Sequence, residues 1–186
     1  MGSHLIFCGP STAGKTTLML GLSHYESEYN FSLDKTWTTR PKRPNENNEE
    51  NIFVSAEEFE NNRDRFLFDF QTFPPYEYGI EIPRPLEEKE IRMRILKPPF
   101  VRIFKSLINE PAVLCSINPF NNNPQKIIDS RDPFINLDDM TDRTSRFESD
   151  LIEANEAADL KFQNINDLDF ALKSLHNLVI RHIKMI

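Results

Sequence analysis

Hydrophobic positions along the chain follow two patterns with different periods. Residues 4–8 (HLIFC) and 112–117 (AVLCSI) are short, continuous apolar runs, a pattern typical of strands that are buried on both faces. Residues 143–158 and 169–184 instead place apolar side chains three or four positions apart, which predicts amphipathic helices. These four segments predict a core of buried strands covered by helices.

Further segments of both kinds alternate along the chain. Additional strands are expected at residues 31–33, 66–70, 77–82, 133–137 and 161–165. Additional helices are expected at 15–23, 101–108 and 124–130, and after Ser55, which opens a capping box with Glu58. Because strands that alternate with helices form mostly parallel sheets with helices on both faces, the sequence predicts a three-layer α/β fold.

Residues 36–97 break this alternation. We expect them to form a small mixed α/β lobe inserted into a single domain, 1–186, whose core comprises 1–35 and 98–186. Within the lobe, residues 91–95 read Ile-Arg-Met-Arg-Ile, and this alternation predicts an exposed strand or hairpin arm. Its basic side chains would be either a solvated strand face or extra contacts to a substrate; they are Arg84, Arg92 and Arg94.

Composition and charge narrow the class of protein. The 186 residues include 39% hydrophobic and 27% charged residues, with a net charge of −7. This acidic balance argues against a general nucleic-acid-binding protein, although it allows a local basic pocket. Apolar runs stay far below the roughly 20 residues that cross a bilayer, and we expect no membrane association and no secretory signal. Cys8 and Cys115 lie in apolar stretches, which predicts reduced core thiols and a cytoplasmic protein.

The strongest motif is residues 9–16, GPSTAGKT, which match the phosphate-binding P-loop pattern G-x-x-x-x-G-K-[ST] without a gap. It follows a predicted strand and opens a predicted helix, the context in which backbone N–H groups and the helix dipole bind phosphates. Lys15 is expected to reach the β- and γ-phosphates of ATP, and the Thr16 hydroxyl to ligate Mg²⁺. The complete set of predicted phosphate-binding residues is Gly9, Ser11, Thr12, Ala13, Gly14, Lys15, Thr16 and Thr17.

A P-loop does not by itself specify a reaction. The sequence lacks the Asn-Lys-x-Asp motif with which GTPases recognise guanine, and its short length with an inserted lobe favours a small kinase. Arg40 and Arg43 lie three residues apart in a polar, proline-bounded loop. Two guanidinium groups there suit a phosphate monoester, since arginine binds its oxygens in pairs. From the sequence alone they could equally be solvated loop side chains.

The order of motifs downstream resembles the guanylate kinase family. After the P-loop come residues 36–43 (TWTTRPKR), 52–59 (IFVSAEEF), 66–70 (FLFDF) and 76–79 (YEYG). The family has S-x-T-T-R-x-x-R, Y-x-F-V-S-x-x-E-F, F-x-E and Y-Y-G in this order. The resemblance covers most of residues 4–82 and resumes over about 141–182.

The resemblance implies roles for several residues. In the family, the matching positions bind the acceptor nucleotide; here they are Thr36, Arg40, Arg43, Asp69 and Tyr78. Tyr78 and the two arginines would hold the acceptor phosphate, and Thr36 and Asp69 would contact the base. Arg143 and Arg146 match arginines that stabilise the transferred phosphoryl group, and Asn164 matches a position near the adenine.

Four departures from the family pattern stand out. The tyrosine of Y-x-F-V-S is replaced by Asn51 or Ile52, and residues 83–99 read as an insertion. The lid, at about 138–150, is shortened. A D-x-D motif expected at the end of the strand after the lobe is missing from residues 113–118, where Ser116 and Asn118 would replace its carboxylates only in part.

The retained residues predict ATP- and Mg²⁺-dependent phosphoryl transfer to a nucleoside monophosphate, with GMP or dGMP as the first candidates. Three alternatives remain open. One is a kinase for another phosphate monoester, such as a modified nucleotide or a ribose bisphosphate. The second is a catalytically weak module that binds a phosphorylated ligand. The third is a non-kinase P-loop nucleotidase or phosphotransferase. Partners would be small nucleotides, and the protein would be a monomer or a homodimer.

Overall fold

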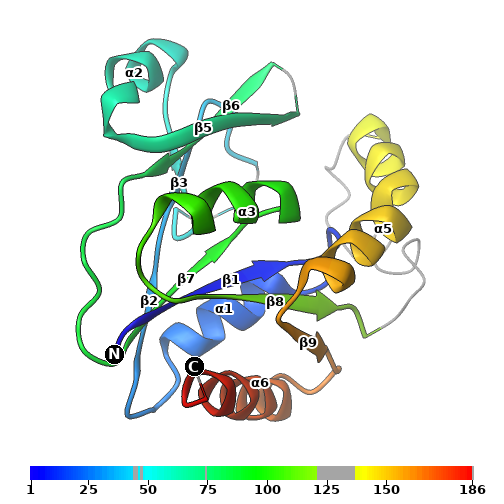
Figure 1. The fold of residues 1–186 in the computed structure, drawn as a ribbon. Coiled ribbons are helices and arrows are strands. Elements are labelled where there is room, and N and C mark those ends of the chain that lie inside the picture. The colour runs from blue at the N-terminus through cyan, green and yellow to red at the C-terminus, as the bar shows by residue number, and fades with distance from the viewer. Residues whose placement is uncertain (44–45, 47, 74, 121–136, 186) are drawn as a thin grey trace.

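A computed structural model describes the chain except for residues 44–45, 47, 74, 121–136 and 186, and except for the side chains of 72–73 and 137–144. Its centre is a five-stranded parallel sheet in the order β2-β7-β1-β8-β9 (Figure 1). The strands are β1 (Ser3–Cys8), β2 (Asn30–Leu33), β7 (Glu90–Ile95), β8 (Ala112–Asn118) and β9 (Leu160–Gln163). The crossovers between them carry helices, as parallel pairing requires.

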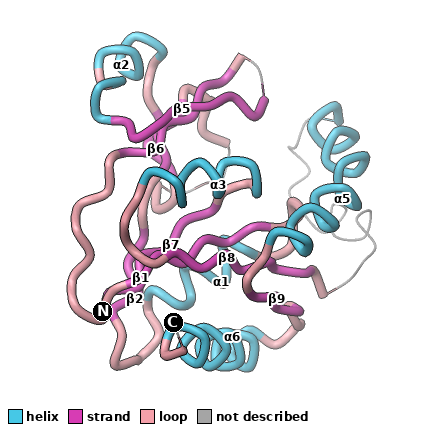
Figure 2. Tube along the Cα trace, viewed as in Figure 1, coloured by secondary structure: helices cyan, strands magenta, loops and turns pink. Residues whose placement is uncertain are grey.

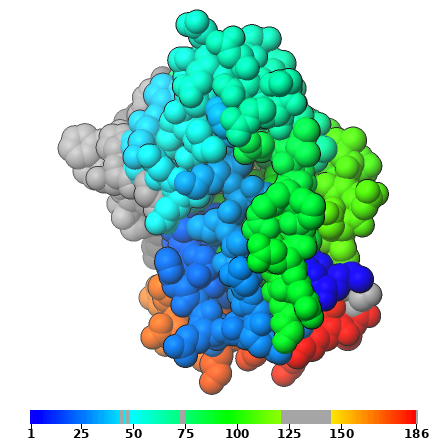
Figure 3. Space-filling view, turned by 90° about the vertical axis from the view of Figure 1, so that its left-hand side faces the viewer, coloured from blue at the N-terminus to red at the C-terminus, as the bar shows by residue number. Residues whose placement is uncertain are grey.

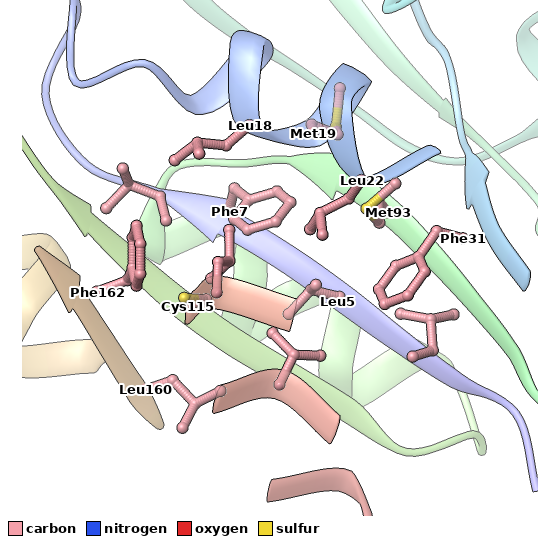
Figure 4. Packing of buried hydrophobic residues seen from close by; sticks show 14 of the residues in the cluster. Leu5, Phe7, Leu18, Met19, Leu22, Phe31, Met93, Cys115, Leu160 and Phe162 are labelled. Carbon is pink, nitrogen blue, oxygen red and sulfur yellow. The ribbon is translucent and has the colours of Figure 1, made fainter. Parts of the chain in front are cut away.

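Helices cover both faces of this sheet, which makes three layers (Figures 1 and 2). On one face lie α1 (Lys15–Ser23) and α6 (Leu168–Ile183), whose apolar side chains pack on Leu5, Phe7 and Cys115 (Figure 4). On the other face lie α3 (Pro98–Leu107) and α5 (Leu137–Ala157), which pack on Ile6, Cys8 and Leu114. The predicted α/β fold with a mostly parallel sheet is confirmed.

A second, four-stranded sheet of order β4-β3-β6-β5 forms a small lobe that stands on the core (Figures 1 and 3). Its elements are β3 (Thr36–Thr38), β4 (Asn51–Phe53), α2 (Ala56–Asn61), the short 3-10 turn η1 (Arg63–Arg65), β5 (Phe66–Phe73) and β6 (Tyr76–Glu81). One face of the sheet packs its own small cluster, made of Trp37, Phe59 and Phe66. The Ser55 hydroxyl accepts from the Glu58 amide 3.0 Å away and so caps α2, as the sequence indicated.

Residues 91–95 form a strand, but the expectation that it is exposed is wrong. β7 is an inner strand of the core sheet between β2 and β1, so the range 36–97 predicted for the inserted lobe extends too far. The charged side chains of β7 can be buried because each has a partner of opposite charge. Arg92 pairs with Glu90 at 3.1 Å, and Arg94, which is 1% exposed, pairs with Asp34. Buried ions are tolerated when they are paired in this way.

Two other predicted elements cannot be compared with the structure. The helix expected at 124–130 and residues 133–136 of an expected strand lie outside the described residues, while Leu137 begins α5, six residues before the expected start. The strands β3 and β4 were not expected, since each has only three residues.

Cys8 and Cys115 are buried free thiols, and burial raises the pKa of Cys8 to about 12. No helix in the described part of the chain is long and apolar enough to cross a membrane.

His4 is a fully buried ionisable side chain under α3. Its ring contacts Phe104 edge-on at 5.1 Å, and neither ring nitrogen has a hydrogen-bond partner among the described residues. Burial and the nearby positive charges of Arg94 and Arg92 lower the pKa of His4 from 6.5 to about 4. The negative charge of Glu90 opposes this shift. The folded protein therefore holds a neutral imidazole where the unfolded chain takes up a proton.

We expect this histidine to destabilise the protein in acid. Since the folded pKa lies below the unfolded one, its contribution is complete above pH 6.5 and is lost as the pH falls toward 4, by about 3 kcal/mol at most. Urea unfolding at pH 7 and pH 5 should show about 2 kcal/mol of this loss in the wild type and a clearly smaller loss in His4→Leu. Equal losses in both proteins would contradict the assignment.

Candidate functional site

Residues 9–14 form a tight loop between β1 and α1, and Lys15 and Thr16 begin the helix. Gly9 and Gly14 have positive φ angles of 129° and 85°, which glycine adopts without strain, and Thr12 has a φ of 76°. A Cβ atom at Gly9 would lie 2.5 Å from the Ile117 carbonyl oxygen, so the loop can pass β8 only with glycine there. The non-glycine Thr12 is held in a sparsely populated conformation, a feature that clusters at ligand-binding sites.

Side chains around this loop hold its shape. Lys15 Nζ donates to the carbonyl oxygens of Gly9 and Pro10, at 2.9 and 2.7 Å. Asn164 follows β9, and its side-chain Nδ2 donates to the Ala13 carbonyl oxygen at 2.9 Å. Its backbone N–H donates to the Asn118 carbonyl oxygen at 2.8 Å. Asn164 thus contacts the P-loop itself. No described contact tests its expected place near an adenine.

The other predicted P-loop residues sit around the start of α1. Ala13 is buried, Ser11, Thr12 and Thr16 are half-buried, and Thr17 is exposed on the first turn of the helix. Gly14 precedes α1 and no side chain caps the helix there, which leaves its first amides directed at the loop. A helix N-terminus of this kind in a Gly-rich loop can bind the phosphates of a nucleotide.

Glu50 immediately precedes β4 of the lobe, and its carboxylate has Thr16 and Lys15 of the P-loop among its electrostatic neighbours. Burial raises the pKa of Glu50, as do the neighbouring carboxylates of Glu46 and Glu49, while Thr16 and Lys15 oppose the rise. The lobe and the P-loop therefore meet at one point. Sequence analysis missed Glu50, because it lies in an acidic, Asn-rich loop with no motif of its own.

Arg40, in the predicted acceptor site, is held by a carboxylate. Its two terminal guanidinium nitrogens bind Glu46, Nη1 at 3.0 Å and Nη2 at 2.6 Å, and the Tyr78 hydroxyl is an electrostatic neighbour. Burial would lower the pKa of Arg40, but Glu46 and Tyr78 outweigh burial and raise it. The fork of Arg40 thus already holds a planar, two-oxygen anion, which is the chemistry required to hold a phosphate monoester.

The other acceptor residues lie near this pair. The Glu46 carboxylate also accepts from the Arg43 backbone amide at 3.0 Å, and the Arg43 side chain is exposed. Thr36 pairs with Ile80 across β3 and β6, and Thr38 pairs with Tyr78. Since directly paired residues share a face of a sheet, Thr36 and Tyr78 lie on the same face. The structure therefore gathers Thr36, Arg40, Arg43 and Tyr78 in one region.

Asp69 does not join this group. It pairs with Gly79 in the β5–β6 ladder, whereas Phe70 pairs with Tyr78 and stacks on its ring at 5.5 Å. Because neighbouring strand residues point to opposite faces, Asp69 faces away from Tyr78. Its carboxylate forms an ion pair with Arg63, which also binds Glu77 at 2.9 Å. The geometry does not support a base contact from Asp69.

We expect Asp69→Asn to leave the KM for any nucleoside monophosphate within about twofold of the wild-type value. The change removes one of three carboxylate partners of the half-buried Arg63, and Asp69 itself is exposed, where ion pairs contribute little. Steady-state kinetics with GMP would measure this. A KM raised tenfold or more at unchanged kcat would show that Asp69 reaches the base and that the register of β5 differs in the complex.

The predicted catalytic arginines lie on α5. Arg146 is exposed on this helix, and the side chain of Arg143 lies outside the described residues. Residues 138–150, predicted as a shortened lid, all belong to α5, and residues 121–136 before them are outside the description. The structure therefore does not test the contact of either arginine with a phosphoryl group.

The D-x-D motif was expected on the strand that follows the lobe, and the sequence pattern placed that strand at residues 113–118, in β8. β7, not β8, follows the lobe, and its alternating positions carry Arg92 and Arg94. The two possible substitutes on β8 are used elsewhere: Asn155 Nδ2 donates to Asn118 Oδ1 at 2.9 Å, and Ser116 Oγ donates to Asn155 Oδ1 at 3.0 Å. The core strands thus direct no carboxylate from these positions toward a metal.

The donor set beside the P-loop nevertheless fits Mg²⁺. A hydroxyl and a carboxylate are hard oxygen ligands, and Thr16 and Glu50 bring one of each together. Among the described residues, no group of three or more His, Cys, Asp or Glu side chains could enclose a metal ion. This is compatible with Mg²⁺, which usually binds through one or two protein ligands together with nucleotide phosphates.

The strand–loop–helix unit at residues 3–23 within a parallel sheet, with a small second sheet beside it, defines a P-loop α/β protein. A crystal structure of guanylate kinase from Anaplasma phagocytophilum has the same fold. It superposes with a TM-score of 0.62 at 19% identity, covering 100% of this chain and 87% of that one.

Part of the sequence also matches a guanylate kinase. Over 79 residues the chain is 40% identical to the guanylate kinase of Blochmanniella floridana. This match covers 41% of the chain and 37% of that relative, well under half the length of either, and no family model matches the chain. The fold and this partial match confirm the resemblance to the guanylate kinase family.

Proposed function

We propose that this protein is an ATP-dependent nucleoside monophosphate kinase, with GMP or dGMP as the first acceptors to test. The observation that carries the proposal is that one fold holds both a P-loop, in which Lys15 Nζ lies 2.9 Å from the Gly9 carbonyl oxygen, and a lobe in which Arg40 holds the Glu46 carboxylate with two nitrogens. Glu50, in the same lobe segment as Glu46, has Thr16 and Lys15 of the P-loop among its electrostatic neighbours. A triphosphate on the P-loop and a monophosphate at Arg40 and Tyr78 would therefore be neighbours. The sequence match to a guanylate kinase supports the same reading.

Each group has a role in this proposal. Lys15 would leave the loop carbonyls to bind the β- and γ-phosphates, and the amides at the start of α1 would hold the remaining oxygens. Arg40, Arg43 and Tyr78 would orient the acceptor phosphate, which attacks without a general base because it is already anionic. Arg143 and Arg146 would neutralise the transferred phosphoryl group. Mg²⁺ bound with the nucleotide would neutralise charge on the β- and γ-phosphates.

Positioning is the main source of rate in such a reaction, because two bound anions must be aligned and little covalent chemistry is left to the protein. We place the enzyme in the cytoplasm, where the buried thiols of Cys8 and Cys115 would stay reduced. The proposal assigns no base contact to Asp69, since its side chain faces away from Tyr78.

An acceptor panel tests the proposal. Purified protein is incubated with ATP and Mg²⁺ and with GMP, dGMP, AMP, CMP, UMP or ribose 1,5-bisphosphate in turn, and ADP release is followed. At least one acceptor should raise ADP release tenfold or more above the acceptor-free rate. If none does, and a phosphorylated peptide binds instead, the chain is a phosphate-binding module and the kinase proposal is wrong.

A further inference from the structure

Donors from Arg40 and Arg43, the two arginines predicted to hold the acceptor phosphate, are bound to a carboxylate of the chain itself. Arg40 Nη1 donates to Glu46 Oε2 at 3.0 Å, and Nη2 donates to Oε1 at 2.6 Å. The Arg43 backbone N–H donates to the same Oε2 atom, also at 3.0 Å. This carboxylate presents two oxygens to a guanidinium fork, as a phosphate monoester does. Glu46 therefore occupies the place where the acceptor phosphate would bind.

Arg40 is also held by contacts that do not involve Glu46. Its backbone N–H donates to Thr38 Oγ1 at 3.1 Å, and its Nη1 donates to the Pro41 carbonyl oxygen at 2.8 Å. Its guanidinium carbon lies 5.3 Å from the centre of the Phe53 ring, a cation–π contact. These contacts would remain if Glu46 moved away, so the fork would stay in position and its donors would become available to another anion.

A second arginine fork in this protein shows what a permanent pair looks like. Arg84 binds both oxygens of Glu90 at 3.0 and 2.8 Å, but Glu90 is fully buried and also accepts from the Ser32 hydroxyl at 2.6 Å. Glu46 lies in the loop between β3 and β4, and its side chain keeps 22% of its surface exposed. Since partly exposed ion pairs contribute little free energy, the pair of Arg40 and Glu46 is the one that an incoming anion can break.

An acceptor phosphate and the Glu46 carboxylate cannot share these donors. Both are anions, and two anions held at hydrogen-bond distance from the same nitrogens repel each other strongly. We propose that the Glu46 carboxylate is a resident occupant of the acceptor-phosphate subsite, and that an incoming phosphate monoester displaces it from Arg40 and from the Arg43 amide. The proposal rests on the acceptor site of the proposed function and deepens it by naming a residue that limits acceptor affinity.

The occupant lowers the affinity for every monophosphate by the same factor, because a ligand binds only the fraction of molecules in which Glu46 has left. A small anion that contacts the fork alone must break the charged hydrogen bonds of Glu46 for little return. A nucleotide gains further contacts elsewhere in the lobe. Glu46 thus favours a nucleoside monophosphate over inorganic phosphate.

The test measures binding of GMP and of inorganic phosphate to the full chain by calorimetry, without ATP. Glu46→Gln keeps the shape of the side chain but removes its charge, and it should bind both ligands about tenfold more tightly than the wild type, since the ligand no longer displaces a charged partner. Glu57→Gln is the matched control. It removes an exposed carboxylate in the first turn of α2, in the same lobe, and should change neither affinity by more than twofold.

A further variant and the sign of the change separate an occupant from a residue that positions Arg40. Glu46→Asp keeps the charge and should return the affinity for GMP toward the wild-type value. Weaker binding of GMP in Glu46→Gln than in the wild type would show that Glu46 positions the fork, and would overturn the proposal. Equal binding in Glu46→Gln, Glu57→Gln and the wild type would also overturn it.

This experiment is independent of the kinase assay, because it involves no phosphoryl transfer. If Glu46→Gln binds GMP more tightly but no acceptor raises ADP release, the occupant is confirmed and the kinase proposal fails. If the wild type and Glu46→Gln both bind neither GMP nor inorganic phosphate, the acceptor site and the occupant fail together. If ADP release depends on an acceptor but Glu46→Gln gains no affinity, the kinase proposal stands and the occupant is wrong.

Discussion

Replacing Lys15 with methionine should lower kcat for phosphoryl transfer by about 100- to 1,000-fold. Methionine keeps most of the side-chain volume but cannot donate a charged hydrogen bond to the phosphates, and loss of one such group costs about 3–4 kcal/mol of transition-state stabilisation. The ammonium group now bonds to the Gly9 and Pro10 carbonyl oxygens, 2.9 and 2.7 Å away, so it already lies inside the loop that would hold the phosphates.

The matched control is Lys173→Met, which removes an exposed lysine on α6. It should keep the wild-type rate, and thermal melting of both variants would show whether either has lost stability. Activity of Lys15→Met within threefold of the wild-type value would mean that the P-loop does not act on the transferred phosphoryl group.

Replacing Arg40 with lysine should lower kcat/KM for the acceptor by about 10- to 100-fold while the KM for ATP changes little. Lysine keeps the charge but has a single ammonium group in place of the planar guanidinium. It therefore loses the paired hydrogen bonds that Arg40 makes to Glu46 and would make to a phosphate. A charged hydrogen bond contributes about 1.5–3 kcal/mol, which corresponds to this range. The effect should fall on the acceptor because Arg40 belongs to the lobe.

Arg181→Lys serves as the control, since Arg181 is exposed in the last turn of α6. Kinetics at varied ATP and varied acceptor would separate the two effects. If the KM for ATP rises in Arg40→Lys while the acceptor kinetics stay unchanged, Arg40 contacts ATP rather than the acceptor.

The parts of this protein that sequence predicts well are those whose causes are local. The P-loop follows from a contiguous motif, and β1 and β8 follow from continuous apolar runs, because a strand buried on both faces needs apolar side chains on both. The capping box at Ser55 likewise involves residues three apart. Each of these features is complete within about ten residues.

The failures depend on partners that lie far away in the sequence. β7 reads as an exposed arm because Arg92 and Arg94 look solvated, and only the fold brings Asp34 to Arg94, 60 residues distant. Asp69 matches a motif position, yet a pairing register that puts it opposite Gly79 turns it away from Tyr78. One residue of register decides which face a side chain occupies, and no local pattern fixes that register.

Glu50 illustrates the same limit at the site. Its loop reads as polar and featureless, and its position near Thr16 depends on how β3 and β4 pair and on how the lobe rests on the core. The motif pattern predicts the metal carboxylates on β8, whereas β7 is the strand that follows the lobe in chain order.

The central claim is that the P-loop and the lobe together transfer a phosphoryl group between nucleotides. The most direct measurement is to incubate the protein with [γ-³²P]ATP, Mg²⁺ and each nucleoside monophosphate, and to separate the labelled products. We expect label in a nucleoside diphosphate, with formation lost in Lys15→Met and reduced in Arg40→Lys. Label found solely in inorganic phosphate, or in no product with any acceptor, would contradict it.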